Sequence, residues 1–442
     1  MNRKAVVKPF YRLFEQRKLS FPAISSTAFI FFIAFNFEFF LHLSSRVPGI
    51  SALRPTLLLV LVCTGLLFSQ KKIFKTRPES NVVSIINGFL IFLLLTLPFV
   101  SFPGSVIKTN IPILLKAIVF FYFTYCCVDT PKRLKIFLIV FVGCQIFRVL
   151  EPLYMNITQG YWGDSTYMGH GEFASRLAGS PYDVINPNEL GFVIATCVPF
   201  LHFLLFPRGL ILKIIYGGLM VCLLYALILT MSRGAFLALL VVAFVVFKES
   251  KNKSLLIVVG IVIAIAGWSV MTPVQKDRYL SLVSSDSKGS KTVDGRLNGM
   301  LNEFKVGFQR PIFGHGIGTS GEAKYHALGD RQASHNLYAE LVMEIGLLGM
   351  VIFLKYFVRI YKELKRIRGL ITPGDVEYEQ ILKTLMTVYF MYLVYSSNYW
   401  GLTQGYWYLF GGLVVAFGRI VSEQVNENSS IDNIKNKSGS LI

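Results

Sequence analysis

Two arginines and a histidine stand where they could do chemistry. Arg233 lies in a tight turn between two apolar stretches, Arg296 in a long polar segment, and His335 at the start of another apolar stretch. A guanidinium grips phosphate oxygens through paired hydrogen bonds, and an imidazole with an ordinary pKa of about 6.5 suits a general base at neutral pH. These residue types indicate the binding of an anionic substrate together with proton abstraction.

Each of the three residues also has a structural interpretation. Arg233 could reach out of the turn to pair with a lipid phosphate. Arg296 could be an exposed arginine on a solvated face, although its expected place in the first turn of a helix opposes the helix dipole. His335 could be a polar cap at the start of its helix. The sequence alone leaves both interpretations open.

A second group of polar residues could assist such a site. The glycine-rich run 314–320 could offer the backbone N–H groups of Gly316 and Gly318 to an anion. Its His315 is a weaker candidate base. Asn336 and Tyr338, directly after His335, are further candidates. Lys116, Arg54 and Arg148 lie near the outer ends of their spans and could line, together with Arg233, a cationic cleft open to lipid. Glu38 and His42 lie within an apolar stretch, where charged groups are often functional, or else pair with each other.

The elements that carry these residues are apolar and long. The chain has 442 residues, 53% hydrophobic and only 16% charged, which indicates an all-α integral membrane protein. Twelve segments are candidate transmembrane helices: 22–43, 50–69, 82–101, 111–128, 134–153, 189–206, 210–230, 235–248, 254–270, 335–354, 380–397 and 402–419. All six cysteines fall within them, so we expect free thiols rather than disulfides. No cleavable signal peptide is evident.

The net charge of +19 is mostly a signal of topology. With a cytoplasmic amino terminus, 27 Lys and Arg fall on the inner side and only four in the short outer segments. Short loops obey the positive-inside rule, so both termini are expected in the cytoplasm and no nucleic acid is expected as a partner.

The predicted spans divide the chain into seven parts. These are a basic cytoplasmic tail (1–21), transmembrane helices (22–153), a periplasmic loop (154–187), transmembrane helices (188–270), a large periplasmic loop (271–334), C-terminal transmembrane helices (335–420) and a cytoplasmic tail (421–442). In the large loop, apolar residues from Leu297 to Phe308 recur at helical spacing, with Asp294 as a plausible N-cap. We therefore expect an amphipathic helix there, at the membrane surface or against the bundle. Asn186 and Pro187 predict another helix start.

No cofactor or metal is expected from the sequence. It holds no outward Asp-x-Asp, no His/Cys cluster with ligand spacing, no phosphate-binding loop of the Walker type and no nucleophile elbow.

Several short runs together resemble the bacterial O-antigen ligase/polymerase superfamily. The runs are Thr230-Met231-Ser232-Arg233-Gly234-Ala235, Gly295-Arg296, Pro311-Ile312-Phe313-Gly314-His315-Gly316-Ile317-Gly318, His335-Asn336-Leu337-Tyr338 and Glu344-Ile345-Gly346-Leu347-Leu348-Gly349. Their order and spacing cover roughly residues 186–360. His315 is a departure, because this turn more often carries an apolar residue there.

The resemblance implies a polytopic glycosyltransferase of the bacterial inner membrane that faces the periplasm. Such enzymes move a glycan from undecaprenyl pyrophosphate to an acceptor hydroxyl without a metal. By motif, Arg233 and Arg296 would bind and neutralise the donor pyrophosphate. His335 would deprotonate or orient the acceptor hydroxyl, with inversion at the anomeric carbon. The partners would be the lipid-linked glycan, an acceptor glycan or lipid A core, and membrane lipids.

Two alternatives stay open at this point. The residues do not separate an O-antigen ligase from a polymerase of repeat units, since both need the same donor site. A transporter of a lipid-linked or anionic solute is a different class, for which polar groups at the middle of the membrane would be expected.

Overall fold

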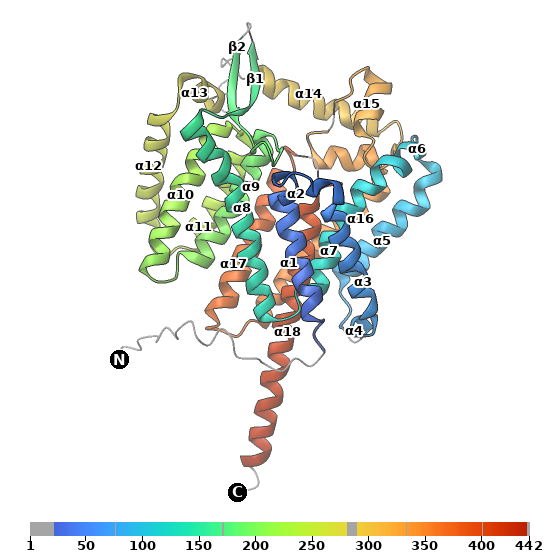
Figure 1. The fold of residues 1–442 in the computed structure, drawn as a ribbon, viewed down its shortest axis with the longest axis vertical. Helices are drawn as coiled ribbons and strands as arrows, with labels where there is room; N and C mark the ends of the chain where they lie inside the picture. The colour runs from blue at the N-terminus through green and yellow to red at the C-terminus, as the bar shows by residue number, and fades with distance from the viewer. Residues whose placement is uncertain are drawn as a thin grey trace.

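A computed structural model shows a bundle of long helices with smaller elements gathered at one end (Figure 1). The structure describes residues 22–75, 77–169, 172–280, 290–332, 334–399 and 401–439. The first half of the chain forms α1 (Ser26–Leu41), α2 (Leu43–Arg46), η2 (Ile50–Leu53), α3 (Pro55–Ser69), α4 (Lys71–Lys75), α5 (Asn81–Thr96), η3 (Leu97–Phe99), α6 (Pro103–Ser105), η4 (Val106–Asn110), α7 (Ile111–Cys127), α8 (Pro131–Gln159), β1 (Gly163–Gly169), β2 (Glu172–Leu177), α9 (Pro187–Phe200) and η5 (Leu201–Leu205). The second half forms α10 (Leu210–Thr230), α11 (Arg233–Glu249), α12 (Lys253–Val270), α13 (Pro273–Leu280), α14 (Ser290–Gly307), α15 (Ser320–Leu328), α16 (Leu337–Leu370), α17 (Val376–Tyr395) and α18 (Gly405–Gly439).

The helices confirm a helical multi-pass membrane protein. Every one of the twelve predicted segments contains a helix. Within the described residues, nine helical stretches are long and apolar enough to cross a membrane. The predicted segments outside those nine are α1, α11 and α17, so the count of twelve crossings stays a prediction. All six cysteines are free, as expected.

The two segments predicted as long loops lie at the same end of the bundle. Figure 1 shows β1, β2, α13, α14 and α15 together at this end, while α18 projects from the opposite one. We call the end that carries β1 and β2 the hairpin end. The loop residues that could do chemistry can therefore meet there.

The first of these segments is not a plain loop. The strands β1 and β2 pair in antiparallel fashion, with Gly163 opposite Leu177 and Tyr167 opposite Phe173. The predominantly helical fold agrees with the predicted all-α class, but these two strands lie where only a loop was predicted, because a short ribbon of polar and aromatic residues gives little periodic signal. The predicted helix start is confirmed, because Asn186 caps α9 and Glu189 bonds back to it.

The amphipathic helix of the second segment exists, but its start was wrong. The helix α14 begins at Ser290, so Asp294 lies within it rather than capping it, and Arg296 falls in its second turn. The argument from the helix dipole therefore does not apply to Arg296, since the dipole acts within the first turn. Leu297 and Leu301 are exposed, whereas Val306 is buried. The predicted apolar stripe is therefore only partly covered: Met300 and Phe304 are half-buried, and α14 packs on α16.

The long helix α16 is broken near its start. Gly346 takes a left-handed φ of +66° and divides a short first part, Leu337–Ile345, from the rest of the helix. Two buried carboxylates on the first part bind backbone N–H groups of other segments. Glu340 accepts from Gly401 and Leu402, and Glu344 from the turn before α15. These bonds fix the first part of α16 between two loops.

Gly346→Ala should destabilise the folded protein by at least about 2 kcal/mol, because a side chain strains the left-handed backbone and has no room. A Cβ at Gly346 would lie 2.3 Å from the carbonyl oxygen of Ile312. The measurement is the midpoint of thermal unfolding in detergent. Gly369→Ala, in the same helix with nothing within 4 Å of its Cβ, is the matched control and should keep the wild-type midpoint. Equal midpoints for the two variants would contradict this account of the break.

Candidate functional site

Arg233 is the first residue of α11 and is buried, with only 6% of its surface exposed. The preceding Met231 takes a left-handed φ of +49° and ends α10, and the Ser232 hydroxyl caps α11 by accepting from the N–H of Ala235 at 3.4 Å. A cation in the first turn of a helix opposes the dipole by about 0.3–1 kcal/mol. That argument, made from sequence for Arg296, applies in the structure to Arg233. The guanidinium is therefore held where helix stability does not favour it.

Two further arginines fix this turn, and sequence reasoning missed both as site residues. Arg176 of β2 donates from Nε to the carbonyl of Thr230 at 2.8 Å, and Arg278 of α13 donates from Nε to the carbonyl of Met231 at 2.9 Å. Cations are favourable at the C-terminal carbonyls of a helix, here α10. One signal was available: outside the large loop 271–334, Arg176 is one of the few basic residues on the predicted outer side, against the trend of the chain.

His335 lies in a short extended segment that leads into α16, and it is partly exposed. Its neighbour Asn336 caps α16 and donates from Nδ2 to the carbonyl of Ser397 at 3.0 Å. The N–H of Leu337 donates to the carbonyl of Ser396 at 2.9 Å. The segment that carries His335 is therefore bonded to the residues that follow α17.

The turn that carries Arg233 lies against the same residues. A Cβ added to Gly234 would lie 3.2 Å from the Cβ of Asn398, so the start of α11 is in direct contact with that loop. We call residues 396–398 the joining segment. It touches the Arg233 turn on one side and the His335 segment on the other, which brings together two motifs a hundred residues apart.

The helix α14 is anchored to this region as well. The Asn336 amide contacts the Met300 sulfur at 3.2 Å, and Ser334 donates to the Glu303 carboxylate at 2.8 Å. Arg296 lies about one turn before Met300 on α14, but its side chain lies outside the described residues. The structure thus places the backbone of the second arginine's helix beside the His335 segment.

The glycine-rich turn departs from the expectation of a phosphate cradle. The N–H of Gly316 donates to the Glu344 carbonyl at 2.8 Å, and the N–H of Gly318 donates to the Glu344 carboxylate at 2.6 Å. Ser320 donates to the same carboxylate at 3.1 Å. These N–H groups are occupied by the protein itself, so the turn serves to hold the first part of α16.

His315 is buried in the wall of this turn. Its Nδ1 lies 3.0 Å from the Ser101 hydroxyl, and its Nε2 lies 3.0 Å from the carbonyl oxygen of Val306. Burial lowers the pKa of His315 below its ordinary value, partly offset by the Val306 carbonyl, and the nearby Arg310 lowers it further. The histidine ties three segments together.

The remaining candidates are dispersed. The Tyr338 hydroxyl donates to the Leu393 carbonyl at 2.8 Å, which makes this residue a link between α16 and α17. Lys116 and Arg54 are exposed and do not line the cavity of about 250 Å³ that Arg148 lines. Arg148 instead donates to Asp183 at 2.6 Å. Among the described residues, no three of His, Cys, Asp and Glu gather as a metal-binding group.

Comparison with protein families gives one match. Residues 218–354, which run from α10 into α16, match the family model described as O-antigen ligase. This match supports the resemblance to the O-antigen ligase/polymerase superfamily that the sequence motifs predicted. The matched region contains the Arg233 turn, α14 and the His335 segment. The family supports a glycosyltransferase-type function in polysaccharide biosynthesis. Comparison with curated proteins gives no match.

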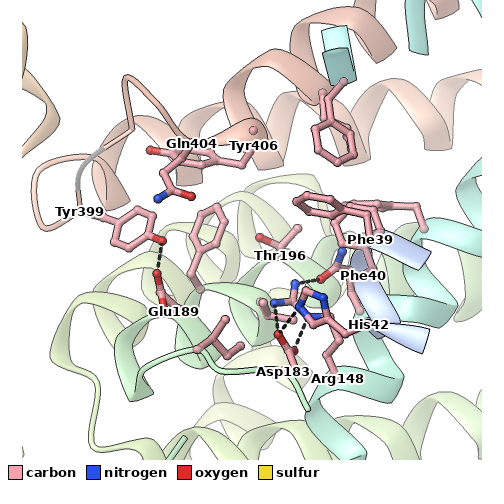
Figure 2. Close-up of a pocket in the computed structure, with 18 of the residues that line it drawn as sticks. Phe39, Phe40, His42, Arg148, Asp183, Glu189, Thr196, Tyr399, Gln404 and Tyr406 are labelled. Carbon is pink, nitrogen blue, oxygen red and sulfur yellow. Dashed lines mark hydrogen bonds and ion pairs between the residues drawn. The ribbon is translucent and has the colours of Figure 1, made fainter. Parts of the chain in front are cut away.

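A cavity of about 250 Å³ lies beside the joining segment (Figure 2). Helices α1, α7, α8, α9, α17 and α18 contribute to it, mostly through aromatic residues: Phe39, Phe40, Phe120, Phe141, Phe192, Tyr392, Tyr399 and Tyr406. His42, directly after α1, also lines the cavity, and its Nε2 lies 3.3 Å from a carboxylate oxygen of Asp183. The expected alternative of a pair between His42 and Glu38 is not formed, because Glu38 accepts from Ser44 instead.

This cavity also has a polar wall. Asp183 accepts two hydrogen bonds from Arg148, at 2.6 and 3.1 Å, in addition to the His42 contact. Burial opposes ionisation of this carboxyl, but the bonds from His42 and Arg148 hold the pKa of Asp183 below its ordinary value. The Tyr399 hydroxyl donates to Glu189 at 2.8 Å. Sequence reasoning did not assign Asp183, Glu189 or Tyr399 to a site.

The buried His315 should make the folded protein less stable against unfolding at acidic pH. Its folded-state pKa lies below the unfolded value of about 6.5, so the unfolded chain takes up the proton first as the pH falls. The contribution is fully present above pH 6.5 and is lost as the pH drops through the folded-state pKa. His315→Gln should flatten this part of the pH dependence, measured as unfolding midpoints between pH 7.5 and 5. His326→Gln, at an exposed position in α15, controls for the substitution itself. An unchanged pH dependence in His315→Gln would refute the assignment.

Proposed function

We propose that this protein is an inverting, metal-independent glycosyltransferase that moves a glycan from undecaprenyl pyrophosphate to an acceptor hydroxyl at the periplasmic face of the inner membrane. One observation carries the proposal. The Arg233 turn and the His335 segment both contact residues 396–398, so an anion-binding group and a basic group come from two sides of one short loop.

Arg233 would bind the donor pyrophosphate together with Arg296. A pyrophosphate diester carries about two negative charges, and fixed guanidiniums stabilise the charge that grows on the leaving oxygen. The start of α11 adds the positive end of a helix dipole to Arg233. Gly316 and Gly318, expected from sequence to help, are left out of the proposal because Glu344 takes their N–H groups.

Arg176 and Arg278 would act as positioning residues for Arg233. Both bond the last carbonyls of α10, directly before the turn. They restrict the backbone of residues 230–231, and preorganisation of this kind lets a charge stabilise a transition state without reorganising first. Their own positive charge also raises the local potential for an anion.

His335 would be the general base. The acceptor oxygen attacks the anomeric carbon, the bond from that carbon to the pyrophosphate oxygen breaks, and the acceptor proton passes to the imidazole. The electron pair leaves with undecaprenyl pyrophosphate, and attack opposite to the leaving group inverts the configuration. The hydrogen bond from the Asn336 side chain to the joining segment would fix the backbone next to His335.

The periplasmic orientation rests on charge. The hairpin end carries Arg233 and His335, whereas the basic segments 71–77, 132–135 and 355–368 hold many of the Lys and Arg residues that the sequence predicts on the cytoplasmic side. Short basic loops favour the cytoplasm. The hairpin end would then face the periplasm, where lipid-linked glycans are presented.

The transporter alternative has one feature in its favour, the broken helix α16. Its two carboxylates, Glu340 and Glu344, bind backbone N–H groups of neighbouring loops. Neither lines the cavity of about 250 Å³. The break therefore supports a packing role, and transfer is the function that the site favours.

Ligase and polymerase differ only in the acceptor, and a deletion separates them. Loss of a polymerase leaves single repeat units on the final acceptor, whereas loss of a ligase leaves long chains on the carrier lipid.

Arg233→Ala should reduce glycan transfer by about 10²–10³-fold, since one preorganised charge at the leaving oxygen is removed. Arg296→Ala should behave alike, and His335→Ala should lose about 10²–10⁴-fold. Purified protein is given a lipid-linked oligosaccharide, and the products are sized on a gel. Arg368→Ala, an exposed arginine near the other end of α16, is the matched control and should transfer normally. Full activity in Arg233→Ala, with normal accumulation in the membrane, would falsify the donor site.

A further inference from the structure

We propose that the cavity beside the joining segment is a subsite for one sugar ring, either of the donor glycan or of the acceptor. The inference rests on the proposed function and adds to it a place for the sugar that is separate from the place for the phosphate. It is carried by the charge balance of the cavity, by the chemistry of its walls and by its contact with the Arg233 turn.

The charge balance of the cavity excludes a phosphate. Arg148 is its guanidinium, and Asp183, 1% exposed in its side chain, accepts two hydrogen bonds from that group. Glu189 adds a second carboxylate to the wall. A bound phosphate would meet Arg148 and His42, which both already contact Asp183, together with the additional negative charge of Glu189, which opposes binding. An uncharged ligand meets no such penalty.

The walls of the cavity also disfavour a hydrocarbon chain. Thr196 is 3% exposed and lines the cavity, where its hydroxyl lies beside that of Tyr392. An isoprenoid chain offers no hydrogen bond to such hydroxyls, so burying them against it would cost free energy. Glu189 and Gln404 line the same space. The occupant should therefore carry hydroxyl groups.

Aromatic faces and hydrogen-bonding groups alternate around the cavity, as a sugar requires. Figure 2 shows Gln404 and Tyr406 at the top of the view, the pair of Tyr399 and Glu189 on the left, and Phe39 and Phe40 on the right. A pyranose offers apolar C–H faces for the rings and hydroxyl edges for the amide and carboxylate. Apolar walls with a few placed polar groups are typical of small-molecule sites.

The size of the cavity suits one ring rather than a chain. Its volume of about 250 Å³ lies just below the range of about 300–1,000 Å³ that is typical of small-molecule pockets. The rest of a glycan would extend from the open side.

The cavity adjoins the proposed phosphate site through two pairs of consecutive residues. Asn188 accepts a hydrogen bond from Arg176, the arginine that holds the Arg233 turn, and the next residue, Glu189, lines the cavity. Asn398 packs on Gly234, and the next residue, Tyr399, lines the cavity. A substrate whose phosphate lies near Arg233 could place a directly attached sugar in this space.

Gln404→Ala tests the subsite with little risk to folding. Among the described residues, no hydrogen bond of the Gln404 side chain is recorded; only its backbone N–H bonds, to Gly401. The full chain in lipid nanodiscs is titrated with undecaprenyl pyrophosphate, and separately with the lipid-linked glycan purified from the cells that produce the chain. For a sugar of the donor, the variant should bind the lipid-linked glycan about three- to tenfold more weakly, which is the loss of one hydrogen bond, and undecaprenyl pyrophosphate equally well.

A second arm identifies the source of the sugar. If Gln404→Ala leaves both lipid affinities unchanged but raises the KM for the acceptor without lowering kcat, the cavity takes the acceptor sugar, and the inference stands. Gln424→Ala, a glutamine at the far end of α18, is the matched control and should change nothing.

Two outcomes are kept apart by this design. Wild-type affinities and KM in Gln404→Ala, and likewise in Tyr399→Phe, would overturn the sugar subsite while leaving the proposed function intact. Failure of the wild-type chain to bind either lipid, or to transfer the glycan, would instead count against the proposed function.

Discussion

The bonds between two buried carboxylates and the backbone amides of two loops fix the geometry of the hairpin end. Glu340 binds the amides of residues 401–402, and Glu344 binds those of residues 318 and 320. A buried carboxylate is stable only when such donors replace water. Because both carboxylates lie on the short first part of α16, the loops before and after the His335 segment are fixed to one rigid element.

The break at Gly346 makes this arrangement possible. Gly314 and Gly346 both take left-handed φ values, and the backbones around them cross so closely that a Cβ on either would lie within 2.5 Å of the other segment. Glycine is the residue that permits both the backbone conformation and the approach. The glycine-rich run, which from sequence suggested a phosphate site, thus serves the packing on which the site depends.

The Arg233 turn depends on a second set of bonds. Arg176 and Arg278 satisfy the last carbonyls of α10, and the first turn of α9 connects this cluster to the cavity through Asn188 and Glu189. Positive charge gathers around the turn, whereas the cationic group of the cavity is paired with Asp183. This contrast separates a place suited to an anion from one suited to a neutral, hydroxyl-bearing ring.

The sequence by itself determined the helical membrane fold, the position of its helices, the cap at Asn186 and the motifs of the superfamily, because apolar runs, capping residues and short motifs are local. It misplaced the start of α14 and missed the hairpin of residues 163–177, whose polar and aromatic residues give little periodic signal. Only the tertiary structure decided that the Arg233 turn and the His335 segment meet at residues 396–398, that Glu344 occupies the glycine turn, and that Asp183 neutralises Arg148. Those outcomes depend on contacts between residues as far apart in sequence as Gly234 and Asn398, and no local pattern encodes them.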